Sequence, residues 1–473
     1  MLRKYISDIA FMQVINLLVK PIWILVIDRA VQNALPQEVY GNYFALYNFS
    51  LMFFIILDLG LNSYNTTEIS RDTQKIVSVA GHIIGLKLIL MIVYVLAALG
   101  VGSILGYTHI EFQILLILCV LQIITSFNQY LRSIVASLQK FKWDGVFMVL
   151  DRIIIIGLCS VLIWGQLDQW SLTIHRFIYA QLIGVSVVLC LLILFLFNHL
   201  TEIKISFNLK KLMPIFYKSW PFALLITLMG LYNYVDSVML KLLVGNEAAG
   251  SYALGYRLFY ALLMFAQIFS GVLLPLFSKN IANTSIIKEI STYTVKFLLL
   301  VALTAVFVSF SYSDEIIKML YPMKYNAENS RTFSLLMIGF IGSVLILVYG
   351  TLLTAALELK YLNIAAFFTL LVNVILNTQL IPVYGPSGAA IATFISQLLF
   401  GSICFMISYR KFKLSWVWSD IWRLSSSVIF LFMSIVTLKQ YMSSPFVHSL
   451  LILGIVGLFA YVFKLFHVKN IPT

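Results

Sequence analysis

Apolar segments of about 20 residues follow one another along the whole chain, and each is long enough to cross a lipid bilayer. They do not alternate apolar and polar residues as the strands of a membrane barrel would, so helices are expected. Fourteen membrane-spanning helices are predicted, at residues 9–30, 43–62, 77–105, 111–137, 145–165, 176–198, 218–244, 251–277, 290–312, 332–356, 361–382, 386–409, 421–441 and 447–466. The sequence therefore predicts an all-α integral membrane protein.

The composition excludes an ordinary soluble protein. Hydrophobic residues make up 61% of the chain and charged residues 11%, whereas soluble domains contain about 25% charged residues. The four cysteines, Cys119, Cys159, Cys190 and Cys404, fall within apolar segments and have no neighbour at metal-ligand spacing. They are expected to be small buried hydrophobic residues, and neither a metal nor a cofactor is predicted.

The net charge of +13 would favour a nucleic-acid partner in a soluble protein. Here the basic residues follow the membrane topology instead. If the N-terminus is cytoplasmic, nineteen Lys and Arg lie in loops on the cytoplasmic side and six in loops on the other. The positive-inside rule then predicts that both termini are cytoplasmic and that nucleic acid is not a partner.

An internal repeat divides the chain. The turn at 34–43 resembles the turn at 244–252, at an offset of 209 residues. This offset places Glu38, Gly41 and Tyr43 on Glu247, Gly250 and Tyr252. Residues 136–141 likewise resemble 355–361, so helices 1–6 and 7–12 are predicted to be two lobes in the same orientation. Parallel repeats imply a pseudo-two-fold axis along the membrane normal.

The predicted organisation has four parts: an N-lobe at 1–200, a basic cytoplasmic linker at 201–217, a C-lobe at 218–409, and two further helices at 410–473. The linker is expected to contact anionic membrane lipid. The longest outer loop, 313–331, could hold a small surface helix but not a catalytic domain.

Several motifs resemble a known family. The most specific one reads Asn-Val-Ile-Leu-Asn at 373–377 and Leu-Ile-Pro-Val-Tyr-Gly-Pro-Ser-Gly-Ala-Ala-Ile-Ala-Thr at 380–393. It is accompanied by Asp-Ser-Val-Met-Leu at 236–240 with Gly-Ser-Tyr at 250–252, Leu-Asp-Leu-Gly at 57–60, and Pro-Leu-Phe-Ser at 275–278. Together they resemble the polysaccharide branch of the multidrug/oligosaccharidyl-lipid/polysaccharide exporter superfamily.

The resemblance implies a fold and a function. The two lobes would form a V that opens alternately to each side of the membrane. The protein would be a flippase rather than an enzyme. It would carry an undecaprenyl-diphosphate-linked oligosaccharide, such as an O-antigen or capsule repeat unit, across the bacterial inner membrane. Polymer-assembly proteins are possible partners.

Cationic residues within the predicted helices suit such a substrate. Seven Lys and Arg lie within these helices away from their ends, against three acids. A diphosphate at membrane depth needs cations in place of water, so Lys20, Lys241 and Arg257 are predicted to bind it. Snorkelling to the interface is the alternative for Lys241 and Arg257. The resemblance implies that helices 1, 2, 7 and 8 line the cavity, and that basic residues there contact the diphosphate in the lipid II flippase, which favours Lys20 and Arg257. Pro21 is expected to kink helix 1.

The acids allow two interpretations. Asp58 and Asp236 lie in opposite lobes and could take up a proton or a sodium ion as the lobes move. They could equally neutralise a lysine such as Lys20 or Lys241. The third acid, Asp151, cannot face its neighbour Arg152 across one helix, so Arg132 on the preceding helix is the expected partner.

Other residues of the spans have more ordinary expected roles. Lys87 and Lys296 are expected to snorkel to the cytoplasmic side. Tyr232 and Tyr234 could stack on sugar, although most tyrosines near helix ends belong to the interfacial belt.

Three alternative functions remain: a flippase for lipid II itself, a multidrug exporter, and a membrane polymerase or glycosyltransferase. A multidrug exporter carries cations and should have an acidic cavity rather than a basic one. A membrane polymerase or glycosyltransferase needs a sizeable outer loop with catalytic residues, and it would leave the repeat unexplained.

Overall fold

A computed structural model describes residues 15–414 except 17, 63–64, 67–68, 70–75, 166–170 and the even-numbered positions from 202 to 208, together with residues 426 and 433. These residues are almost entirely helical and contain no strand. Nine of the described helices are long and apolar enough to cross a membrane. The two predicted C-terminal helices, 421–441 and 447–466, lie outside the described residues apart from 426 and 433.

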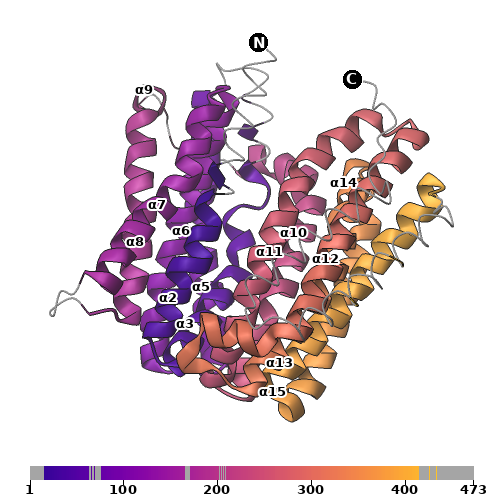
Figure 1. Ribbon diagram of the computed structural model, residues 1–473. Helices are drawn as coiled ribbons and strands as arrows, with labels where there is room; N and C mark the ends of the chain where they lie inside the picture. Colours follow the sequence, from indigo (N-terminus) through magenta and orange to yellow (C-terminus); the bar gives the residue numbers. More distant parts are fainter. Residues whose placement is uncertain are drawn as a thin grey trace. The chain divides into compact units, whose positions relative to one another are not determined.

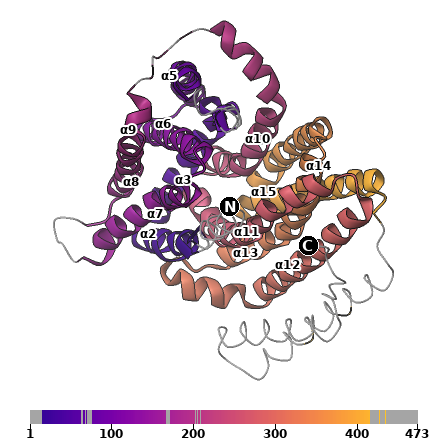
Figure 2. The same cartoon turned by 90° about the horizontal axis from the view of Figure 1, so that it is seen from above.

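The chain forms two compact units, Met1–Gly250 and Ser251–Thr473. The helices of the first unit are η1 (Trp23–Asp28), α2 (Arg29–Ala34), α3 (Gln37–Met52), η2 (Phe54–Leu57), α5 (Ile76–Ile104), α6 (His109–Ser137), α7 (Phe141–Trp164), α8 (Ile174–Phe195), α9 (Phe197–Leu200) and α10 (Leu209–Leu243). Within it α6, α7 and α8 pack against one another (Figures 1 and 2). Buried residues such as Ile83, Ile134 and Leu192 join α5, α6 and α8 in one apolar core.

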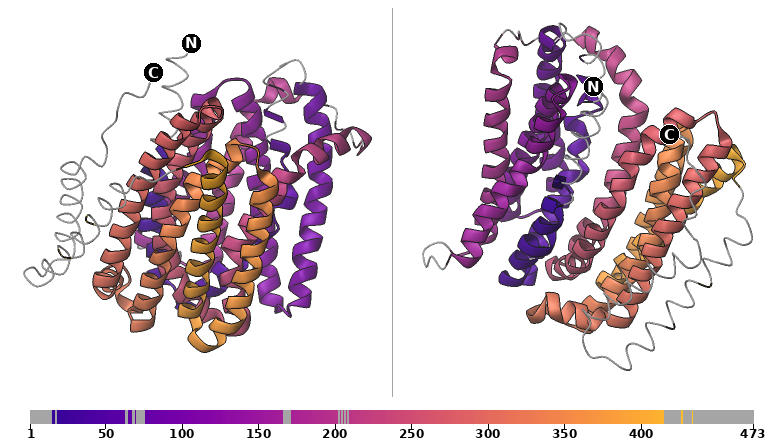
Figure 3. Two further views of the ribbon diagram at one scale, coloured as in Figure 1. Left: turned by 90° about the vertical axis from the view of Figure 1, so that its right-hand side faces the viewer. Right: turned by 45° about the horizontal axis from the view of Figure 1, so that its top comes forward.

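The second unit contains most of α11 (Asn246–Asn280), then α12 (Thr284–Leu320), η5 (Pro322–Lys324), α13 (Ala327–Leu345), η6 (Ile346–Gly350), α14 (Thr351–Ala355) and α15 (Leu359–Phe412). Here α13 packs against both α12 and α15 (Figure 3). Non-helical backbone at Tyr312 separates residues 313–320 of α12, which form the small helix expected in the outer loop. Three cysteines are buried as expected, whereas Cys190 is exposed on α8.

The predicted helices 361–382 and 386–409 are the two arms of α15. They meet at Gly385, whose φ of +54° and ψ of −133° break the helix. Positive φ at this position favours glycine, which has no Cβ to clash with the backbone. Three residues on, a methyl group at Gly388 would meet the carbonyl oxygen of Leu380. The signature glycines are therefore required by the turn they form.

Two turns show the repeat in the backbone. The turn after α6 has positive φ at Gln139 (58°), and the turn after α14 has positive φ at Leu357 (57°). In each turn this residue donates its N–H to the carbonyl three residues earlier, at 2.9 Å and 3.0 Å. In the repeat, Gln139 of the first turn therefore corresponds to Leu357 of the second.

Repeat-related glycines also contact each other. A methyl group on Gly41 would meet the carbonyl oxygen of Asn246, and one on Gly250 would meet that of Gln37. Both contacts join residues that the offset of 209 exchanges, Gly41 with Gly250 and Gln37 with Asn246.

Helix α10 packs on α3 and belongs to the first unit. It begins at Leu209, inside the segment expected to be a linker. The C-lobe that begins at residue 218 and includes α10 therefore remains a prediction about which helices move together.

Gly41→Ala should destabilise the protein by about 1–3 kcal/mol, because the added methyl group has no space against the α11 backbone. Gly100→Ala on α5 is the matched control, since nothing lies within 4 Å of its added carbon. That variant should be neutral or more stable by up to about 1 kcal/mol, as alanine favours helix. Thermal unfolding in detergent compares the two, and equal stability would contradict the tight crossing.

Candidate functional site

Cationic side chains gather around helix 1 in the first unit. Lys20 is half-buried, and the charges of Arg132, Arg152 and Asp151 all act on it. Among the described residues, Lys20 forms neither a hydrogen bond nor an ion pair. An accessible ammonium without a partner at membrane depth is suited to bind an anion.

The two arginines of this cluster are held by acids. On α6, the Nε atom of Arg132 donates to the Oδ1 atom of Asp144, at the start of α7, over 2.8 Å. On α7, the Nε atom of Arg152 lies 3.7 Å from the Oδ2 atom of Asp151. The expected pair of Arg132 with Asp151 is therefore wrong, and so is the expectation that Asp151 cannot pair with its neighbour Arg152. Asp144 was missed because α7 begins at Phe141 rather than at 145.

Helix 1 is distorted next to Lys20. Two residues after Pro21, where a kink is expected, the helix becomes π-helical from Trp23 to Asp28. Such wider turns inside helices are frequent at functional sites. The ring of Trp23 lies 5.4 Å from the guanidinium carbon of Arg152, which links this segment to α7.

The same segment ends in a buried acid that the sequence analysis overlooked. Asp28 is 1% exposed. Its carboxylate accepts hydrogen bonds from the Tyr40 hydroxyl, at 2.9 Å and 3.1 Å, and from the Gln32 amide, at 3.0 Å. Asp28 was not predicted as a site residue because it lies near the predicted end of helix 1. An acidic residue inside an apolar segment nevertheless indicates a paired or functional position.

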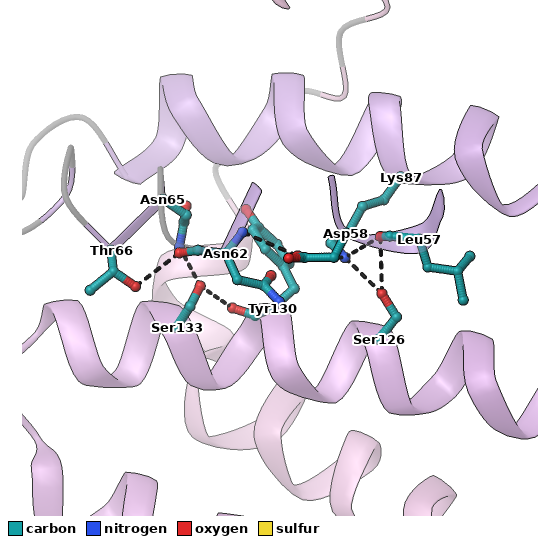
Figure 4. Close-up of polar contacts among 9 residues, drawn as sticks. All are labelled: Leu57, Asp58, Asn62, Asn65, Thr66, Lys87, Ser126, Tyr130 and Ser133. Carbon is teal, nitrogen blue, oxygen red and sulfur yellow. Dashed lines mark hydrogen bonds and ion pairs between the residues drawn. The ribbon is translucent and has the colours of Figure 1, made fainter. Parts of the chain in front are cut away.

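Asp58 lies where helix 2 breaks, and its nearest cation is Lys87 rather than Lys20 or Lys241. The two charged atoms are 4.0 Å apart (Figure 4). Lys87 on α5 is 2% exposed and donates to the carbonyl of Leu57 and the hydroxyl of Ser126, each at 2.8 Å. The expectation that Lys87 snorkels is wrong. It lies eleven residues into α5, which is about 16 Å along a helix. Lys296, also expected to snorkel, is only 7% exposed.

Lys241 has a complete set of partners in the first unit. Its ammonium lies 2.5 Å from Glu111 Oε1 on α6, donates to Asn42 Oδ1 on α3 at 2.7 Å, and sits 4.5 Å from the Tyr107 ring centre. Glu111 also closes the capping box at the start of α6 with Thr108. These contacts favour a role for Lys241 in holding α10 against α3 and α6.

The other predicted residues of α10 lie on its buried side. Asp236 is 2% exposed and Tyr232 is 6% exposed, and their spacing of four residues puts them on one helix face. Tyr234 is half-buried. The adjacent Ser237 accepts a hydrogen bond of 2.8 Å from Asn48 on α3.

Arg257 belongs to the second unit, where it is half-buried on α11. The two asparagines of the signature, Asn373 and Asn377, are fully buried on α15 and joined by a hydrogen bond of 3.0 Å. Within the described residues, no group of three His, Cys, Asp or Glu side chains could hold a metal ion.

Comparison with known proteins identifies the family. The family model described as "Polysaccharide biosynthesis protein" matches residues 4–281, more than half of the chain. The chain belongs to this family. No curated protein matches the sequence.

Solved structures agree on the fold. The lipid II flippase MurJ in an inward closed conformation has a TM-score of 0.73 at 17% identity, covering 97% of each chain. An inward-facing multidrug resistance MATE transporter has a TM-score of 0.63 at 14% identity, covering 85% of this chain and 98% of that one. A transporter from Pyrococcus furiosus, titled as having a binding pocket of reversed polarity, has a TM-score of 0.62 at 16% identity, covering 87% and 96%.

The chain is therefore a multi-pass membrane protein of the polysaccharide biosynthesis family, with the fold of the lipid II flippase MurJ and of the MATE transporters.

The pair of Lys241 and Glu111 should contribute measurably to stability. A double-mutant cycle of Lys241→Met and Glu111→Gln should give a coupling energy of about 0.5–3 kcal/mol, because both side chains are less than 15% exposed. The more exposed pair of Lys411 and Glu358 is the matched control, with an expected coupling of about 0–1 kcal/mol. Unfolding in detergent measures both cycles. Equal coupling in the two would show that Lys241 is not held by Glu111.

Proposed function

We propose that this protein is a flippase for undecaprenyl-diphosphate-linked oligosaccharides of the O-antigen or capsule type. It would work by alternating access in the bacterial inner membrane, with both termini in the cytoplasm. The charge distribution over the loops supports this orientation. Family membership supports a lipid-linked polysaccharide precursor as the substrate.

The observation that carries the proposal is the state of Lys20. The neighbouring arginines each have an acid, whereas the Lys20 ammonium is half-buried and forms no hydrogen bond with any described residue. Three cations and two acids leave the cluster with a net positive charge. A diphosphate would supply the missing negative charge and accept the hydrogen bonds of the ammonium.

Other residues have subordinate roles in the proposal. Arg257 is proposed as a phosphate ligand, since it is a half-buried cation on an apolar helix. Tyr234 is half-buried and more available for stacking on sugar than Tyr232. Asp236 is proposed as an acid that responds to a coupling ion, a proton or sodium. Lys241 is proposed as a weaker substrate ligand, because its ammonium already contacts Glu111 and Asn42.

Complementation in two bacterial strains tests the substrate. One strain lacks its O-antigen flippase, and the other is depleted of its lipid II flippase. Restored surface polymer in the first strain alone is the expected result. Rescue of growth in the second strain would identify lipid II as the substrate and overturn the proposal.

Lys20→Ala should reduce surface polymer about tenfold or more, because a charge-assisted hydrogen bond contributes about 1.5–3 kcal/mol. Lys20→Arg should retain most of the export, since arginine also binds phosphate. Lys411→Ala, at an exposed ion pair, is the control with unchanged export at equal protein level. Full export by both Lys20→Ala and Arg257→Ala would refute the phosphate site.

A further inference from the structure

Helix 2 is broken in the first unit, and the break has unusual backbone. Helix α3 ends at Met52, η2 follows at Phe54–Leu57, and Leu59 and Gly60 have positive φ values of 44° and 82°. The equivalent helix of the second half, α11, continues without a break from Asn246 to Asn280. The break is therefore particular to helix 2 rather than a requirement of the repeated fold.

Side chains of α5 and α6 bind backbone carbonyls before the break and at it. Before the break, the Tyr94 hydroxyl of α5 donates to the Ser50 carbonyl at 3.1 Å. At the break, Lys87 of α5 donates to the Leu57 carbonyl at 2.8 Å, and Ser126 of α6 donates to the same oxygen at 3.1 Å (Figure 4). Lys87 and Tyr94 are seven residues apart, which puts both on one face of α5. One face of α5 therefore supplies a donor to each of these carbonyls.

The Lys87 ammonium is buried among groups that attract a cation. Because Ser126 gives its proton to the Leu57 carbonyl, its Oγ atom can only accept from Lys87, at 2.8 Å. The Oδ1 atom of Asp58 lies 4.0 Å from the ammonium, and the ring centre of Tyr130 lies 5.7 Å from it. A carbonyl, a hydroxyl oxygen, a carboxylate and an aromatic ring together form a binding site for a monovalent cation.

We propose that Lys87 is a tethered cation. In ion-binding transporters, the carbonyls freed where a membrane helix is broken coordinate a cation taken from solution. Here the amino group of the chain itself lies against the freed carbonyl, at hydrogen-bond distance. Lys87 thus does for helix 2 what a bound alkali-metal ion does at such breaks, and it keeps the helix broken without an ion from solution.

The arrangement differs from an ordinary buried ion pair. The ammonium makes its two short contacts, at 2.8 Å each, to uncharged oxygens, and the carboxylate of Asp58 is farther away at 4.0 Å. Lys87 is therefore positioned by the break in helix 2 rather than by the acid, which makes it a positioning residue for this helix. The inference concerns cation binding at the break and does not depend on the substrate of the proposed flippase.

Thermal unfolding of the full chain in detergent tests the inference, with ethylammonium and sodium as the probes. Lys87→Ala removes the amino group and leaves a space bounded by acceptors, so the unfolding midpoint should fall by about 5–10 °C. Ethylammonium or sodium chloride should raise the midpoint of this variant, whereas N-methylglucamine chloride at the same ionic strength should not. The wild type already contains its cation and should respond to none of the three salts. Stabilisation of Lys87→Ala by neither small cation would overturn the inference.

Further variants show where the cation binds. Adding Ser126→Ala to Lys87→Ala should remove most of the response, because it deletes one of the two oxygens that contact the ammonium. An unchanged response would place the cation elsewhere and overturn the inference. Lys87→Met fills the space without a charge, so it should be less stable than the wild type and insensitive to ethylammonium. Lys87→Met with wild-type stability would show that the charge is not needed.

Two controls separate the possible failures. Lys411→Ala, at an exposed ion pair, should not respond to ethylammonium. If Lys87→Ala does not accumulate in membranes, Lys87→Gln decides, because glutamine keeps N–H donors but has no charge. Lys87→Gln that equals the wild type in membrane level and unfolding midpoint would overturn the inference. Lys20→Ala should behave like the wild type in all three salts whatever it does to export, so failure of the flippase proposal is recognised separately.

Discussion

Charge pairing inside apolar helices is the constraint on which the first unit depends. An ionised side chain at membrane depth costs about 2.5–3.5 kcal/mol on insertion scales, so it needs a partner or a function. Arg132 has Asp144, and Lys241 has Glu111. These pairs join α6 to α7 and α10 to α6, so the charges that would oppose membrane insertion also set which helices are neighbours. Lys20 departs from this rule among the described residues, which is why it is proposed as a phosphate ligand.

The positions of most helices could be predicted, because apolar runs of bilayer length leave few alternatives. Helix ends were less predictable, since polar residues also occupy the first turns of helices. Helix α7 begins at Phe141 and α10 at Leu209, several residues before the expected starts. The difference matters for chemistry, because the earlier start of α7 brings Asp144 to Arg132. The glycines of the signature were predictable in role, since only a turn at Gly385 separates the two arms of α15.

Partners of charged residues could not be predicted in the same way. Pairing depends on which helices are neighbours and on the rotation of each helix, and neither is contained in the hydropathy of a single segment. Arg132 was therefore assigned the wrong acid, and Lys87 was expected at the interface although it caps the broken end of helix 2. The position of Lys87 three turns into α5 was the available signal, by the reasoning that singled out Lys20.

The two halves of the repeat do not share one register along their whole length. Gly41 corresponds to Gly250 at an offset of 209 residues, whereas Gln139 corresponds to Leu357 at an offset of 218. The halves therefore differ by nine residues between these two points, and the hydropathy of a single segment does not reveal where. The third helix of each half nevertheless contains a buried lysine, Lys87 at 2% exposure and Lys296 at 7%. Burial of a lysine at this depth is therefore a feature of both halves and not an accident of one.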